Sequence, residues 1–101
     1  MSMKSKAEIE MDFSRAINQA QELEEVAGEL TSIATSNVDE MLDLLRGSWK
    51  GDNSELFLKS GRLISSDILA TADDLMKVAR NIRATAGIVY KAEKAALQII
   101  Y

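Results

Sequence analysis

Apolar residues recur every three or four positions through nearly the whole chain, and this repeat is interrupted at a single place. The spacing is that of amphipathic helices, and because the chain has no proline, nothing forces a break within either repeat. The interruption, Gly47-Ser48-Trp49-Lys50-Gly51, holds two glycines and predicts a tight loop. We therefore predict one domain over residues 1–101, with a first helix at about 5–46, a loop at 47–52 and a second helix at about 53–100.

The repeating residues predict the seam along which the two helices pack. Two long helices joined by a tight loop predict an all-α fold, an antiparallel two-helix hairpin. In the first helix the seam comprises Ile9, Phe13, Ala16, Ala20, Leu23, Ala27, Leu30, Ala34, Met41 and Leu44. In the second helix the steps alternate between four and three residues, as in a heptad repeat, through Phe57, Gly61, Ile64, Ile68, Thr71, Leu75, Val78, Ile82, Thr85, Val89, Ala92, Ala96 and Ile99.

Charge is distributed unequally between the two predicted helices. Residues 5–46 hold ten carboxylates and three cations, whereas residues 53–101 hold seven cations and five carboxylates. This opposite bias favours side-by-side packing of the helices, although each exposed ion pair contributes little. The start of the first helix has the Ser5-x-x-Glu8 spacing of a capping box.

Both helices also carry apolar residues beside the seam, more than one shared interface can cover. A stripe of this kind usually marks a partner surface, and Ala72, Ala79 and Ala86 form a strip of small residues that permits close helix approach. We expect two hairpins to associate into a four-helix bundle, and self-association and a different partner fit the pattern equally well. The residues expected at this dimer interface are Ile17, Val26, Ile33, Val38, Ala72 and Ala79.

The composition removes most of the groups that catalysis and metal binding require. Histidine and cysteine are absent, so the commonest general base, the thiolate nucleophile and most transition-metal ligands are missing. We predict no enzymatic activity, no catalytic residue, no metal and no cofactor, and we interpret the carboxylate groups within 22–29 and 39–43 as solvated helix faces. The net charge of -4 and the lack of a basic cluster argue against nucleic acid as a partner. The lack of a long apolar run argues against membrane insertion.

The predicted loop carries Trp49-Lys50-Gly51, a Trp-x-Gly element at the midpoint of a helical chain of 101 residues. In this respect the whole chain resembles the WXG family, the small ESAT-type proteins that bacterial type VII secretion systems export. The resemblance implies secretion without a cleavable signal peptide, with a final location outside the cell or at its surface. It also implies two kinds of partner: the ATPase of the secretion system, and a second chain in a homodimer or a heterodimer with a related WXG-type protein or a secreted toxin.

The resemblance assigns a secretion and recognition motif to Trp49, Gly51, Tyr90 and Glu93. Trp49 has two compatible interpretations, as an apolar plug that covers the end of the hairpin and as a contact for the secretion machinery. The family's C-terminal signal has an acid four residues after a tyrosine, whereas here Glu93 follows Tyr90 by three. Residues three apart still share a helix face, so these two side chains present either a recognition patch or ordinary helix surface, on which substitution should barely disturb folding.

Three functions fit the sequence. The first is a WXG-type substrate or effector of a type VII secretion system that acts through protein–protein interaction. The second is a targeting partner or chaperone of a larger secreted toxin. The third, unrelated to secretion, is a helical scaffold subunit of a cytoplasmic complex.

Overall fold

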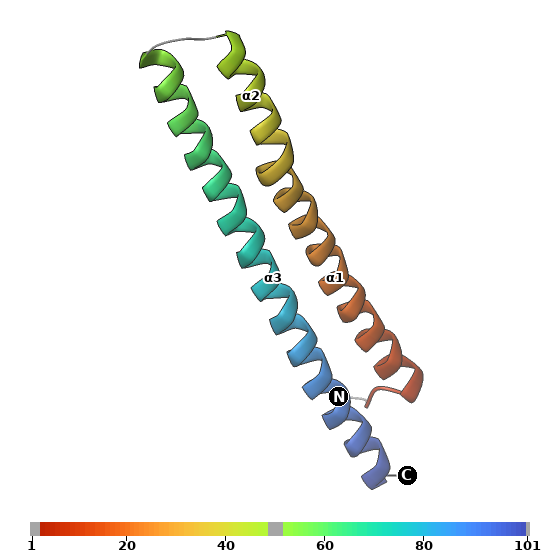
Figure 1. Cartoon of the computed structure of the whole chain (residues 1–101). Helices are drawn as coiled ribbons and strands as arrows, with labels where there is room; N and C mark the ends of the chain where they lie inside the picture. Colours follow the sequence, from red (N-terminus) through yellow and green to blue (C-terminus); the bar gives the residue numbers. More distant parts are fainter. Residues whose placement is uncertain (1–2, 49–51, 101) are drawn as a thin grey trace. The chain divides into compact units, whose positions relative to one another are not determined.

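The computed structural model describes residues 3–48 and 52–100, and from Lys6 onward all of the described residues are helical (Figure 1). Helix α1 spans Lys6–Ser32 and is followed without a break by a π-helix, η1, at Ile33–Asn37. Helix α2 then spans Val38–Ser48, and helix α3 spans Asp52–Ile100. The all-helical fold predicted from the apolar repeat is confirmed, and so are two long helical stretches flanking the predicted loop.

Helix α1 begins at the capping residues that the sequence indicates. The backbone N–H of Glu8 donates to Ser5 Oγ at 3.2 Å, and the Ser5 hydroxyl donates to Glu8 Oε1, also at 3.2 Å. The first turn is closed by the N–H of Ile9, which donates to the Ser5 carbonyl at 3.0 Å. These contacts satisfy backbone donors that a helix start otherwise leaves without partners.

The chain divides into two compact units. Unit 1 combines Met1–Glu24 with Met76–Tyr101, and unit 2 is Glu25–Leu75. Within unit 1, Glu10 meets Tyr90 and Glu24 meets Arg83, so the residue number rises on one helix as it falls on the other. Within unit 2, Ala34 meets Ser65 and Leu42 meets Gly61 in the same order. Each unit is therefore an antiparallel helix pair, and the predicted helical hairpin is confirmed.

The π-helix lies where the sequence is poorest in strong helix formers. Residues 31–37 read Thr-Ser-Ile-Ala-Thr-Ser-Asn, which are β-branched or hydroxyl-bearing residues apart from one alanine and one asparagine. The hydroxyls of Thr31 and Thr35 donate to the carbonyls four residues earlier, at 2.9 and 2.8 Å, an arrangement that bends helices. The N–H of Val38 reaches back five residues to the carbonyl of Ile33, so this turn contains one residue more than an α-turn.

This extra residue changes the seam that the sequence predicts for the first helix. The prediction holds from Ile9 to Ala34, whose residues are buried or half-buried, and fails afterwards. Met41 and Leu44 are 51% and 77% exposed, while Val38 and Leu42 are 8% and 6% exposed. The π-turn advances the buried face by one residue, which the uniform α-helical spacing of the prediction did not include. Val38, expected at a partner interface, is thus part of the interior of unit 2.

The seam of α3 is also displaced by one residue in half of its positions. One predicted row is buried or half-buried at Gly61, Ile68, Leu75, Ile82 and Ala96, as expected, whereas Val89 of the same row is 44% exposed. In the other predicted row Phe57 is half-buried, and the remaining members are exposed: Ile64, Thr71, Val78, Thr85, Ala92 and Ile99. Burial falls instead on the residues that directly follow them, such as Ser65, Ala72, Ala79 and Ala86.

The displacement replaces larger side chains at the contact by small ones, and small side chains allow helix axes to lie closer together. Ala72 is 4% exposed in unit 2 and Ala79 is 0% exposed in unit 1. The expectation that these two alanines offer surface to a second chain is therefore wrong. Their small size serves the close helix approach that the sequence indicated, but within each unit.

Gly61 is a point of close contact between the two helices of unit 2. A Cβ atom placed on Gly61 would lie 2.6 Å from Leu42 Cδ2 and 2.9 Å from Leu42 Cδ1. The Leu42 side chain therefore occupies the space that any other residue at position 61 would need. The same test at Gly28, in the same unit, finds no atom within 4 Å.

We predict that Gly61→Ala and Gly28→Ala change stability in opposite directions. Alanine is favoured over glycine by about 1 kcal/mol in a helix interior, so Gly28→Ala should raise the free energy of unfolding by up to that amount. Gly61→Ala should lower it by about 1 kcal/mol, because overpacking against Leu42 exceeds the same helical gain. Urea denaturation followed by circular dichroism measures both, and an equal gain in the two variants would contradict the Leu42–Gly61 contact.

Candidate protein interaction surfaces

Two of the predicted recognition residues, Trp49 and Gly51, lie outside the described residues. Their two interpretations, end plug and recognition element, stay predictions. The described residues contain the other predicted motif, Tyr90 and Glu93, and three of the six residues expected at a dimer interface require reassignment. Val38, Ala72 and Ala79 are interior residues, as shown above, and Ile17 is considered below.

Tyr90 lies in unit 1, half-buried against α1. Its ring packs on Phe13 with the centroids 4.5 Å apart and the planes inclined by 38°. Its hydroxyl donates to Glu10 Oε1 at 2.8 Å. The ammonium of Lys94 lies 5.1 Å from the centre of the same ring and 2.8 Å from Glu10 Oε1. Tyr90 thus contacts α1 through Phe13 and Glu10. Lys94, on the same helix as Tyr90, contacts both the Tyr90 ring and Glu10.

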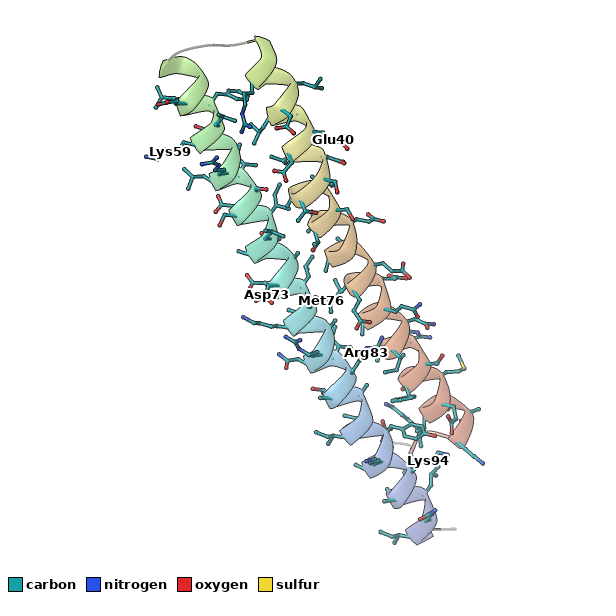
Figure 2. All side chains as sticks on the ribbon, in the orientation of Figure 1. Glu40, Lys59, Asp73, Met76, Arg83 and Lys94 are labelled. Atoms are coloured by element: carbon teal, nitrogen blue, oxygen red, sulfur yellow. The ribbon has the colours of Figure 1, made fainter. Side chains whose placement is uncertain are left out.

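Glu93 also has a partner on the opposite side of unit 1. Glu93 Oε2 lies 3.2 Å from Lys4 Nζ, and the same ammonium lies 2.9 Å from Asp12 Oδ2. Further along the pair, Arg83 contacts Glu24 at 2.5 Å, and Figure 2 shows Arg83 directed from α3 toward α1. The opposite charge bias of the two helices predicted pairs of this kind. It could not predict which residues meet, because that requires the register of the two helices.

These ion pairs shift the pKa values of their members in the directions that favour the charged forms. Hydrogen bonds from Lys94 and Tyr90 lower the pKa of Glu10, and the hydrogen bond from Lys4 lowers the pKa of Asp12. Hydrogen bonds to Asp12 and Glu93 raise the pKa of Lys4, and a hydrogen bond to Glu10 raises the pKa of Lys94. All of these side chains are partly exposed, so each pair contributes little to stability.

Unit 2 carries a different kind of surface. Four large apolar side chains each immediately precede a residue of the observed seam, and all are exposed: Val26 45%, Ile33 40%, Met41 51% and Ile64 56%. The two helices are right-handed and antiparallel. The residue just before a seam residue therefore lies on the same side of the pair, whichever helix it belongs to. These residues therefore share one side of unit 2, which we call the apolar flank.

Ile17 does not belong to this flank. It lies nine residues before Val26, and at about 100° per residue that separation places the two on opposite sides of α1. Ile17 instead shares a seven-residue row with Glu10 and Glu24, the two carboxylates that contact α3 in unit 1. It is half-buried in unit 1, and its place at a dimer interface stays a prediction.

Among the described residues, no group of three or more acidic side chains is arranged to hold a metal ion. Within the same part of the chain, no helix is both long and apolar enough to cross a membrane. Comparison with known proteins adds no relative, since no family model, curated protein or solved structure matches the chain. Two surfaces of the described residues are candidates for protein interaction: the polar contacts around Tyr90 in unit 1 and the apolar flank of unit 2.

The contacts of Tyr90 change the expectation that its removal barely disturbs folding. We predict that Tyr90→Ala lowers the free energy of unfolding by about 2 kcal/mol, because the half-buried ring loses its packing on Phe13. Tyr90→Phe keeps the ring and should lose only about 1 kcal/mol, the size of one hydrogen bond. Chemical denaturation of both variants measures the difference, and an unchanged stability of Tyr90→Ala would show that the ring contact is not formed in solution.

Proposed function

We propose that the chain acts by binding other proteins, as a WXG-type small helical protein exported by a bacterial type VII secretion system, and that it is not an enzyme. The observation that carries the proposal is the apolar flank of unit 2. Val26, Ile33, Met41 and Ile64 come from both members of the helix pair and lie exposed on one side of it. Exposed apolar side chains gathered in this way mark an interaction surface rather than a solvated one.

The flank suits a second helix pair as its partner. Because both helices of unit 2 contribute to it, a pair laid against the flank would contact both and form a four-helix arrangement. The second pair belongs either to another copy of this chain or to a related WXG-type protein or toxin. Under this proposal, Trp49 and Gly51 contact the secretion ATPase, the chain leaves the cell without a cleavable signal peptide, and it acts outside the cell or at its surface.

The contacts of Tyr90 and Glu93 favour a second candidate, in which the chain is the targeting partner or chaperone of a larger secreted toxin. The acid follows the tyrosine by three residues rather than four, and both side chains already have partners in unit 1: Tyr90 binds Glu10 of α1, and Glu93 binds Lys4, which precedes α1. A partner that carries its own export signal would remove the need for an accessible signal here. In both candidates the flank binds a partner. They differ in which chain the secretion system recognises.

We predict that the wild-type protein is not monomeric and that Ile33→Glu makes it so. A carboxylate at the centre of the flank would be buried without a counter-charge on association, a cost of several kcal/mol. In the monomer the same side chain would remain solvated, so helicity should be retained. Light scattering at micromolar concentration, compared with the chain mass of 11.1 kDa, reports the association, and circular dichroism reports the helicity.

Ser32→Glu is the matched control, because it adds the same charge to the neighbouring, exposed residue. Residues 32 and 33 are separated by about 100° around the helix, and Ser32 lies farther from the seam. This variant should associate like the wild type. A folded wild-type monomer would contradict self-association and leave a heterologous partner as the occupant of the flank.

Export tests the rest of the proposal. We predict that Trp49→Ala reduces secretion by the producing strain more than its loss of stability explains. If Trp49 were only an end plug, the variant should lose about 3 kcal/mol and be exported in proportion to its folded fraction. Secretion assays combined with thermal melts of the same variant separate these cases, and normal export of a folded Trp49→Ala protein would reject the recognition role.

The same assay distinguishes the three functions. Export of the wild type alone supports the substrate role. Absence of its own export, together with a toxin whose export depends on it, supports the targeting role. A chain that is never exported and on which no exported protein depends would support the cytoplasmic scaffold and overturn the proposal.

A further inference from the structure

Unit 1 contains a cavity of about 230 Å³ between its two helices. Its walls are largely apolar and include Ile9, Phe13, Ala16, Ile82, Ala86 and Val89. Thr85 and Tyr90 also line it, together with three charged residues: Lys4, Asp12 and Glu93. The side chains of these three are partly exposed and form a polar edge where the cavity meets solvent, and the exposed Thr85 and Val89 show that solvent reaches the cavity elsewhere as well.

One ammonium group already lies at this opening. Lys4 Nζ is 2.9 Å from Asp12 Oδ2 and 3.2 Å from Glu93 Oε2, so two carboxylates share a single cation. Lys4 precedes the capping residue Ser5, and moving its side chain away leaves the start of α1 intact. Without Lys4, the opening would hold two negative charges beside an apolar cavity.

That combination is the complement of a lysine side chain. The aliphatic stem of lysine packs on apolar surface while its ammonium stays at the polar edge. A cavity of about 230 Å³ is smaller than the roughly 300–1,000 Å³ of pockets for drug-sized ligands, yet it accommodates one long side chain. The contact is made by a compact ammonium, which lysine supplies and the planar guanidinium of arginine does not.

We propose that the cavity and the two carboxylates at its opening form a receptor for a lysine side chain presented by a partner protein, with Lys4 occupying the site when the partner is absent. Binding exchanges one ammonium for another, so both carboxylates remain paired throughout. The proposal rests on the geometry of unit 1 and stands whether or not the chain is exported. Lys4 acts as an internal competitor that weakens binding without abolishing it.

The test uses the full-length chain and two blocked tripeptides, acetyl-Ala-Lys-Ala-amide and the same peptide with norleucine in place of lysine. Binding is followed by NMR through the methyl groups of Ala16, Ala86 and Val89, which line the cavity. The lysine peptide should cause saturable shifts of these methyls in Lys4→Ala. Its affinity for the wild type should be about fivefold weaker, the effect expected of an exposed ion pair that must be displaced.

Three controls define the site. Lys6→Ala removes a neighbouring lysine that does not line the cavity and should bind like the wild type. Adding Asp12→Asn and Glu93→Gln to Lys4→Ala should abolish the shifts, and the norleucine peptide should cause none. Circular dichroism of each variant checks that it is folded, and Lys4→Gln replaces Lys4→Ala if the latter is not.

Three outcomes would overturn the proposal. The first is the absence of saturable shifts in folded Lys4→Ala or Lys4→Gln. The second is equal binding of the norleucine peptide, which would show an apolar cavity with no preference for a cation. The third is equal affinity of the wild type and Lys4→Ala, which would show that Lys4 does not occupy the site.

Discussion

Close approach of two helices at small side chains is the constraint on which both units depend. Among the described residues, eight apolar side chains are buried and five of them are alanine: Ala20, Ala27, Ala34, Ala72 and Ala79. No large side chain in this part of the chain is fully buried. Alanine lets the backbones approach but removes little apolar area from water, so it adds little stability of its own. Each unit therefore depends on its few larger buried side chains, Ile9 in unit 1 and Val38 and Leu42 in unit 2, and on the partly exposed larger side chains that flank the seam.

The two units use different flanking chemistry. In unit 1, Glu10 and Glu24 of α1 reach Tyr90, Lys94 and Arg83 of α3, and exposed ion pairs of this kind select the pairing register more than they add stability. In unit 2 one side of the pair carries the four exposed apolar residues of the flank. Leu42 there requires glycine opposite it, so steric fit selects the register instead of charge. A flank of ion pairs and hydrogen bonds is stable when exposed to water, whereas an apolar flank gains stability when a partner covers it.

Most of the helical architecture could be predicted from the sequence, but the exact face of each helix could not. Periodicity, the absence of proline and the Ser5–Glu8 cap indicate where helices form, and the structure agrees. The predicted seam is wrong where the packed helices bury a small residue rather than its more hydrophobic neighbour: Ala79 is buried and Val78 is exposed. It failed again after η1, because no spacing rule shows that a π-turn will add a residue. The contacts of Tyr90 and the cavity beside it depend on the register, which emerges only when the helices are packed.

This dependence on register changes how a short motif should be interpreted. A tyrosine and an acid three residues apart on a helix form a recognition patch only if both side chains are available. In unit 1, Tyr90 donates to Glu10 and Glu93 holds Lys4, so a partner that recognises either must replace an existing contact. Because these contacts are exposed and individually weak, replacement is thermodynamically inexpensive. A partner that displaces Lys4 and supplies its own cation keeps Glu93 paired. A partner that supplies only apolar surface leaves Glu93 without a cation. The internal contacts of unit 1 therefore discriminate between partners through the charge that each partner brings.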